Sequence, residues 1–297
     1  MSWLFYALLA PAVYSVINFT DKYIVEKELK DYSCVPVFAG IVAILFGTCF
    51  WLFTGMQVLS PRDGALIMAS GVLSVLSYVV YLKALSEEET SNVTIFFQVT
   101  PVITLILSLI FLNEPVTFKQ YIGFFVVLAV SFGMAYKPGE KVAFSRAFWY
   151  IMLWDLSLAV SIIIVKFVVE QASFEKILSY ESWGVALGSL LLFTFSKKIR
   201  DSFLKTVKSI PARTIGILVF NEIMFIFSKA LTFFSFTLGP AVLVNVLEGT
   251  QVFYAIVYGF ILMKIAPKVF KEDVSTKGLT KKIVFACLLF VGIWLVY

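Results

Sequence analysis

The amino-acid sequence predicts an all-α integral membrane protein with ten transmembrane helices, arranged as two five-helix repeats of inverted topology. The composition is the first evidence, because 60% of the 297 residues are hydrophobic and only 14% are charged, whereas soluble domains carry about 25% charged residues. The second is a series of apolar segments about 20 residues long, the length that crosses a hydrocarbon core as a helix. The third is a set of motifs in the first half that returns in the second.

Ten apolar segments are long enough to form membrane helices. They run without the strict apolar–polar alternation that marks the strands of a membrane β-barrel. The chain begins Met-Ser-Trp and enters the first apolar segment at once, with no basic region and no small-residue cleavage site, so we interpret this segment as a membrane helix rather than a signal peptide. The expected spans are residues 2–22, 34–54, 63–85, 91–112, 118–136, 147–169, 177–196, 212–236, 239–263 and 281–297.

Several spans and one connection carry features that shape them. Pro11 in the first span and Pro101 in the fourth each free a backbone carbonyl and permit a kink. Gly184 and Gly188 in the seventh span form a small-xxx-small pattern, which allows another helix to approach closely. Residues 197–213 place apolar residues on one side of a basic segment, which suits an interfacial helix. An ordinary solvated basic loop is the alternative for this segment.

Motifs recur in the same order in the two halves. The first span ends with residues 22–26, KYIVE, and the sixth ends with residues 166–170, KFVVE. Thr90-Ser-Asn-Val begins the fourth span and Gly239-Pro-Ala-Val begins the ninth, 149 residues later. Because each unit has an odd number of spans, the second unit inserts upside down relative to the first. Inverted repeats of this kind are typical of secondary transporters, in which the substrate binds between the two halves.

The repeat divides the chain into residues 1–140 and residues 141–297. Most of the 24 lysines and arginines lie in the connections that follow odd-numbered spans, whereas the connections on the other side hold only Arg62, Lys119 and Lys176. The positive-inside rule therefore predicts a cytoplasmic basic side, with both termini outside. We expect the protein in a bacterial or archaeal cell membrane.

The composition also excludes several classes of chemistry. The chain has no histidine, which removes histidine triads and histidine metal ligands. Cys34, Cys49 and Cys287 are scattered through apolar runs, so they are expected to be small core residues rather than disulfides or zinc ligands. No glycine-rich phosphate loop is present. We expect no cofactor and no nucleic acid. The expected partners are a small-molecule substrate and the bilayer, with protons as hypothetical coupling ions, and the sequence leaves a homodimer open.

The candidate substrate site lies in the ninth span. Asn245, Glu248 and Gln251 are spaced i, i+3 and i+6, so they share one face of a continuous helix. A carboxylate at the middle of a membrane costs about 2.5–3.5 kcal/mol on insertion scales. A cavity, a partner charge, a proton or a substrate must compensate for this cost, and the ninth span is therefore predicted to carry the site.

Further ionisable residues lie in the second half. Lys229 of the eighth span is expected at the depth of Glu248. The two could bind a zwitterionic or charged substrate, or Lys229 could neutralise Glu248 or Glu222 as a structural pair. Asp155, Glu222 and Glu248 are the proton-coupling candidates, because ionisable groups within a membrane are commonly functional.

The first half supplies milder lining candidates. Asn18, Tyr78 and Gln98 are the polar residues that we expect on the cavity wall. The positions that correspond to Glu222 and Lys229 in the first half are apolar. The scaffold therefore repeats, whereas the site does not.

The fourth span carries a family resemblance. It runs from Thr100-Pro101-Val-Ile-Thr-Leu to Phe-Leu-Asn-Glu114-Pro-Val-Thr. With two five-helix halves, the chain resembles the EamA-like branch of the drug/metabolite transporter superfamily. The resemblance implies export or exchange of amino acids, nucleotide sugars, metabolites or cationic drugs. It also implies cytoplasmic termini, where the charge rule predicts the reverse. In the second half, Met263-Lys264 stands where the family's second glutamate would fall.

These observations favour a secondary transporter, exporter or exchanger, of a small polar metabolite by alternating access. An amino acid or similar zwitterion is the expected substrate, because the cavity is expected to offer a cation and acids together. A nucleotide-sugar or lipid-linked carrier is the alternative, but it would need more than one basic residue facing the cavity. A non-transporting membrane scaffold is a further alternative. An enzyme is not expected, since no catalytic constellation is recognisable.

Overall fold

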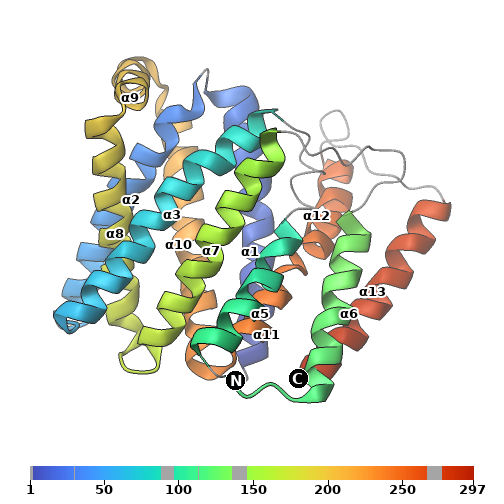
Figure 1. Ribbon diagram of the computed structural model, residues 1–297. Coiled ribbons are helices and arrows are strands. Elements are labelled where there is room, and N and C mark those ends of the chain that lie inside the picture. Colours follow the sequence, from blue (N-terminus) through green and yellow to red (C-terminus); the bar gives the residue numbers. More distant parts are fainter. Residues whose placement is uncertain (1–2, 30, 88–96, 113, 136–145, 266–275) are drawn as a thin grey trace.

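The chain folds into a bundle of helices (Figure 1). The computed structural model describes residues 3–29, 31–87, 97–112, 114–135, 146–265 and 276–297. Both chain termini lie at one end of the bundle, and a short helix, α9 (Lys197–Ser209), lies at the opposite end (Figure 1). The protein is an integral membrane protein, and all of its regular secondary structure in the described ranges is helical. Seven helical segments in the described ranges are long and apolar enough to cross a membrane.

The helices follow the expected spans closely. The first half contains α1 (Trp3–Tyr23), η1 (Ile24–Glu28), η2 (Tyr32–Cys34), α2 (Val35–Phe53), α3 (Pro61–Glu87), η3 (Phe97–Val99), α5 (Thr100–Phe111) and α6 (Phe118–Ala135). The second half contains α7 (Arg146–Val169), α8 (Phe174–Phe195), α9, α10 (Ala212–Leu238), α11 (Ala241–Glu248), α12 (Gln251–Ile265) and α13 (Thr276–Val296). The start of the fourth expected span lies outside the described residues. Three apolar helices are shorter than the seven, namely Thr100–Phe111, Phe118–Gly133 and Ile283–Val296.

Helices α3 and α8 cross at close range because glycines face the backbone of the partner helix. A Cβ atom at Gly184 would collide with the backbone of Met68, and one at Gly71 would collide with the carbonyl oxygen of Glu181. A Cβ atom at Gly188 would lie 3.0 Å from the Cα atom of Val72. The small-xxx-small pattern in α8 therefore allows the close helix contact that it predicts. This close crossing fixes the position of Glu181.

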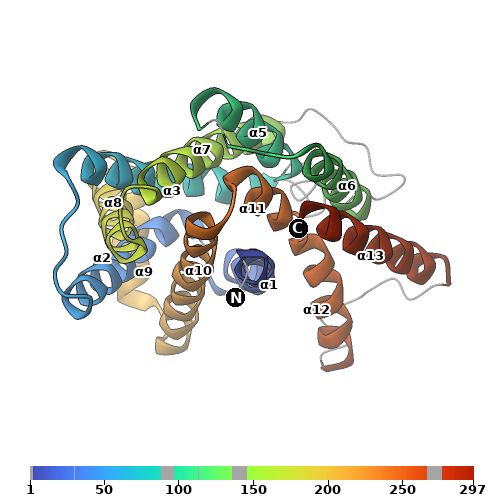
Figure 2. The ribbon, with the colours of Figure 1, turned by 90° about the horizontal axis from the view of Figure 1, so that it is seen from below.

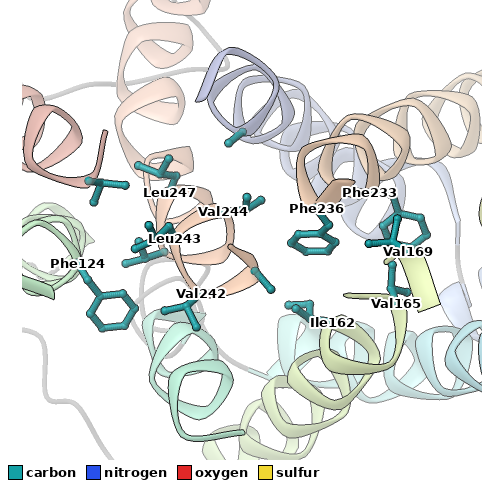
Figure 3. Packing of buried hydrophobic residues seen from close by; sticks show 14 of the residues in the cluster. Phe124, Ile162, Val165, Val169, Phe233, Phe236, Val242, Leu243, Val244 and Leu247 are labelled. Atoms are coloured by element: carbon teal, nitrogen blue, oxygen red, sulfur yellow. The ribbon is translucent and has the colours of Figure 1, made fainter. Parts of the chain in front are cut away.

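The largest buried apolar cluster surrounds the short helix α11 (Figure 3). Leu243 and Leu247 have no exposed surface, and Val242 is 1% exposed. These side chains belong to one cluster with Phe124 of α6 and Phe236 of α10. Six of the eight residues of α11 are apolar, so most of its surface has to be buried. The packing therefore holds α11 firmly in the middle of the bundle.

The basic segment after α8 forms the helix α9. Ile199 is buried, and the ring of Phe203 packs against Phe38 of α2 and Phe193 of α8, with centroid distances of 5.1 and 5.9 Å. Val207, farther along the same stripe, is 48% exposed. The helix interpretation of this segment is confirmed. The first part of its apolar stripe packs on the bundle, and the later part is open.

The ninth expected span is broken into two helices. Helix α11 ends at Glu248 and α12 begins at Gln251, and Gly249-Thr250 forms the turn between them. The amide of Thr250 bonds to the carbonyl oxygen of Leu247 at 2.9 Å, which is a tighter turn than that of an α-helix. The expectation of one continuous helix with Asn245, Glu248 and Gln251 on a single face is wrong, since a glycine weakens the helix at this point. Figure 2 shows that α12 leaves α11 at an angle and that α1 lies between α10 and α12.

Candidate functional site

A cavity of about 170 Å³ lies between α1, α3, α7, α10 and the break that separates α11 from α12. A single water molecule needs about 10–15 Å³ of such space, so the cavity has room for a small molecule. Six of the residues expected at the site lie on its wall. They are Asn18, Tyr78, Lys229, Asn245, Glu248 and Gln251. The helix break brings three of them to the cavity, although they do not share one helix face.

Glu248 is the last residue of α11, and neutral donors hold its carboxylate. The hydroxyl of Thr232 on α10 donates to Oε1 at 3.2 Å, and the amide nitrogen of Asn245 donates to Oε2 at 3.1 Å. Because α11 ends at this residue, the turn at Gly249 leaves the carboxylate at the cavity wall. Among the described residues, no lysine or arginine forms an ion pair with Glu248.

Lys229 has a different partner from those expected. Its ammonium nitrogen lies 2.6 Å from Oε1 of Glu181 on α8, and the two side chains are 10% and 2% exposed. The expected pairing with Glu248 or Glu222 is therefore wrong. Depth along a span does not determine which helix faces which, and α8 packs beside α10. Glu181 carried one usable signal, because it lies three residues before Gly184 on the helix face that packs against α3.

Asp21 is a second acidic residue that sequence reasoning missed. Its side chain lies on the cavity wall and is 4% exposed. The hydroxyl of Tyr78 and the amide nitrogen of Asn221 both donate to Oδ1, at 3.1 and 2.8 Å. The residue lies beside Lys22 at the end of an apolar run, so the sequence suggests a membrane boundary. Helix α1 continues through Tyr23 and places the carboxylate inside the protein.

A smaller cavity of about 40 Å³ adjoins the first. Glu222 lies on its wall together with Glu181 and Asn221. Tyr78 and Lys229 line both cavities. The smaller cavity has room for water, and it places the carboxyl group of Glu222 one side chain away from the main cavity.

Asp155 lies behind the cavity wall rather than on it. The hydroxyl of Thr100, which lines the main cavity, donates to Oδ1 of Asp155 at 2.7 Å. Asp155 has no exposed surface, and its Oδ2 atom has no hydrogen-bond partner in the described part of the chain. The side chain of Gln98 lies outside the described residues. Its backbone belongs to η3, whose first residue, Phe97, lines the cavity.

Two charged residues, Glu114 and Lys166, form a clamp that links several helices at the end of the bundle that bears the termini. The ammonium group of Lys166 donates to the carbonyl oxygens of Phe236 and Gly239, at 2.9 and 3.1 Å, and lies 3.4 Å from Oε1 of Glu114. The backbone amide of Ala241 donates to the same Glu114 oxygen at 2.8 Å. The clamp therefore ties α7, α10 and the start of α11 to the end of α5, beside the cavity-lining Phe236.

The fold is that of an integral membrane protein with an internal cavity, whose largely apolar wall carries a small number of polar and charged side chains. Residues 1–136 match the EamA-like transporter family. This match spans a little less than half of the chain, and it supports the resemblance to the drug/metabolite transporter superfamily, whose members are membrane transporters. A transporter of this type takes a small-molecule substrate and works within a lipid bilayer.

The whole chain also has the fold of a solved structure that is described only as "Crystal structure of protein". The TM-score is 0.66 at 13% sequence identity, and the match covers 99% of this chain and 97% of that chain. At this level of identity the likeness extends to the fold alone. No curated protein matches the sequence.

Proposed function

We propose that the protein is a secondary transporter, exporter or exchanger, that moves a small polar metabolite by alternating access of two inverted five-helix repeats. The observation that carries the proposal is the position of the main cavity. Its wall combines α1 and α3 of the first half with α7, α10 and the α11–α12 break of the second half. A site made by both halves changes shape when one half moves against the other.

The packing of the helices supports the two-repeat arrangement. If residues 1–140 and 141–297 are equivalent units, then α1 corresponds to α7 and α3 corresponds to α10. Helix α1 packs on α10, and α7 packs on α3, so each of these contacts is the image of the other. Helices α2 and α8, and likewise α6 and α13, pack on their own counterparts. On this arrangement the three shorter apolar helices complete ten crossings.

A helix break in the second half and a change of helix type at the equivalent position of the first half support a moving centre. The ninth span breaks at Gly249-Thr250, and η3 gives way to α5 at Thr100. Gly249 and Thr100 are separated by 149 residues, the same offset that separates Gly239 from Thr90. Interrupted helices at the centre of a transporter provide both the binding groups and the points at which the helices bend.

The charges at the cavity favour an amino acid or similar zwitterion as the substrate. Its ammonium group would supply the cation that Glu248 lacks. A nucleotide sugar or a lipid-linked phosphate would need free basic groups, and Lys229 is already engaged by Glu181. We further propose that protons drive transport through the carboxyl groups of Asp155, Glu222 and Glu248. The basic end of the bundle would face the cytoplasm of a bacterial or archaeal cell, with the termini outside.

Uptake by proteoliposomes tests the proposal. The protein would be reconstituted and supplied with labelled amino acids, sugars and nucleotides, with and without a pH gradient. We expect uptake of amino acids that responds to the gradient, and loss of this uptake in Glu248→Gln. Glu175→Gln is the matched control, because Glu175 lies on α8 and lines neither cavity.

Thermal unfolding in detergent would verify that both variants are folded. A folded wild-type protein that carries none of the compounds would contradict the transport proposal. Uptake that does not change with pH, in the wild type and in variants of Asp155, Glu222 and Glu248, would contradict the proposed proton coupling.

A further inference from the structure

We infer, on the basis of the proposed transport function, that the cavity selects its substrate through a positively charged nitrogen that bears N–H groups. A carboxylate on the substrate is dispensable. Primary amines are therefore ligands in their own right, and simple anions are excluded. Glu181 is the residue that sets this preference, because it keeps Lys229 from binding anions.

The balance of charge on the wall is the first argument. Asp21 and Glu248 are the acidic residues that line the main cavity, and Lys229 is the cation among the described lining residues. The ammonium group of Lys229 lies 2.6 Å from Glu181, which neutralises it. The two acids on the wall therefore have no unpaired cation among the described residues that line the cavity. A cationic ligand would supply the missing charge.

The hydrogen bonds around Glu248 are the second argument. The hydroxyl of Thr232 and one N–H of the Asn245 amide group donate to this carboxylate. The Oδ1 atom of Asn245 is left as a buried acceptor with no partner among the described residues, and the residue is 1% exposed. An ammonium group has three donors and no acceptor, whereas a carboxylate has only acceptors. The groups at this end of the cavity therefore match an ammonium group.

The same pattern recurs around Asp21. The hydroxyl of Tyr78 and the amide nitrogen of Asn221 both donate to this carboxylate. The Oδ1 atom of Asn221, which is 2% exposed, has no partner in the described ranges. In both clusters the asparagine amide group donates to the neighbouring carboxylate. In both, the amide oxygen is left without a partner among the described residues. Buried acceptors of this kind are costly unless a donor reaches them.

A row of aromatic rings adjoins Asp21 and continues along the main cavity. Tyr78 and Tyr81 have ring centroids 6.0 Å apart, Tyr81 and Trp154 are 5.7 Å apart, and Trp154 and Phe97 are 4.6 Å apart. All four rings line the cavity. The face of an aromatic ring attracts a cation within about 6 Å of its centroid. The cavity-lining Phe225 already has the ammonium nitrogen of Lys229 at 4.8 Å from its centroid, so cation–π contact occurs at this wall.

A matched series of ligands tests the inference on the wild-type protein. Phenylalanine, phenethylamine and 3-phenylpropionate share one side chain and differ only in the charged groups. Leucine, isoamylamine and 4-methylpentanoate form a second series. Binding is measured by ligand-induced thermal stabilisation of purified protein, and transport by competition and counterflow in proteoliposomes. We expect the amines and amino acids to stabilise the protein and to compete with each other, and the acids to do neither at tenfold higher concentration.

Variants of the ion pair test the role of Glu181. Glu181→Gln frees Lys229, so we expect amine binding to weaken at least tenfold and binding of the carboxylic acids to appear. The double variant Glu181→Gln/Lys229→Met removes both charges, so it should regain amine binding and lose acid binding. Glu175→Gln on the same helix should behave like the wild type. If Glu181→Gln gains no acid binding, and the double variant binds the same ligands as this single variant, then Glu181 does not set the preference.

The outcomes separate this inference from the proposed function. If amino acids are transported and the amines neither bind nor compete, the inference is wrong and the transport function stands. If amines bind and nothing crosses the membrane, the cation site stands and the transport function is wrong. If the acids bind as well as the amines, or if none of the six compounds binds, the inference is wrong.

Discussion

The ammonium nitrogen of Lys229 and a carboxylate oxygen of Glu181 lie 2.6 Å apart inside the bundle, where both side chains are at least nine-tenths buried. The pair joins α10 to α8, and α8 is fixed against α3 by the glycines at their crossing. Removing one member of a buried ion pair leaves an uncompensated charge, which is far more costly than removing both. The pair therefore couples the stability of the bundle to the charge of its cavity.

This coupling predicts a non-additive effect on stability. Glu181→Gln and Lys229→Met should each lower the free energy of unfolding by about 3–5 kcal/mol, since each strands a buried charge. The double variant should lose clearly less than the sum of the two. Thermal or chemical unfolding in one detergent would measure all four proteins. Additive losses would mean that the two groups do not interact in the folded protein.

The clamp of Glu114 and Lys166 should control access from the end that bears the termini. In a Cys49→Ser/Cys287→Ser background, which removes the two exposed cysteines, the variant Phe233→Cys would report that access through its reaction with a membrane-impermeant thiol reagent. Glu114→Gln removes the carboxylate from Lys166 and from the α11 amides, so we expect faster labelling by a factor of several.

The neighbouring Glu170 supplies the control for this experiment. It lies 3.6 Å from Lys166, but its side chain is 55% exposed, and exposed ion pairs contribute about 0–1 kcal/mol. Glu170→Gln should therefore leave the labelling rate unchanged. Equal labelling of the wild type and Glu114→Gln would show that the clamp does not limit access.

The break after Glu248 should matter for turnover more than for binding. Gly249→Ala favours a continuous helix by about 0.5–1 kcal/mol, so it should slow transport several-fold and leave ligand-induced stabilisation almost unchanged. Gly216→Ala is the control, because a Cβ atom there meets nothing within 4 Å and Gly216 lies inside α10. Counterflow rates and thermal shifts would be compared for the two variants. A Gly249→Ala protein with wild-type rates would remove any role for the turn in the transport cycle.

The helices were predictable because each apolar segment is about as long as a membrane is thick. Asn245, Glu248, Gln251 and Lys229 were found for the same reason, since a polar residue stands out in an apolar run. Asp21 was missed because it lies near the end of such a run, where charge is ordinary. Its burial depends on α1 extending to Tyr23 and on α3 and α10 packing beside it, which no single segment of sequence encodes.

The partner of Lys229 was predicted wrongly for a related reason. Depth can be estimated from the rise along a helix, but the direction in which a side chain points depends on how the helices are rotated against one another. The break at Gly249 also escaped prediction, because a run of apolar residues continues on both sides of it. Sequence patterning thus located the polar groups, whereas their pairing followed from tertiary packing.

The clamp at Glu114 has no acidic counterpart in the second half, where position 263 is a methionine. If the protein alternates between two orientations as proposed, the clamp stabilises the orientation in which it is formed, so the two orientations differ in energy before any substrate binds. Without substrate, the protein would mostly occupy the orientation in which the end that bears the termini is closed. This preferred orientation of the empty protein determines which side of the membrane the cavity faces first. It also determines how quickly an empty carrier returns to its starting orientation. The net direction of flow still follows the gradients alone, because a bias in the resting state performs no work.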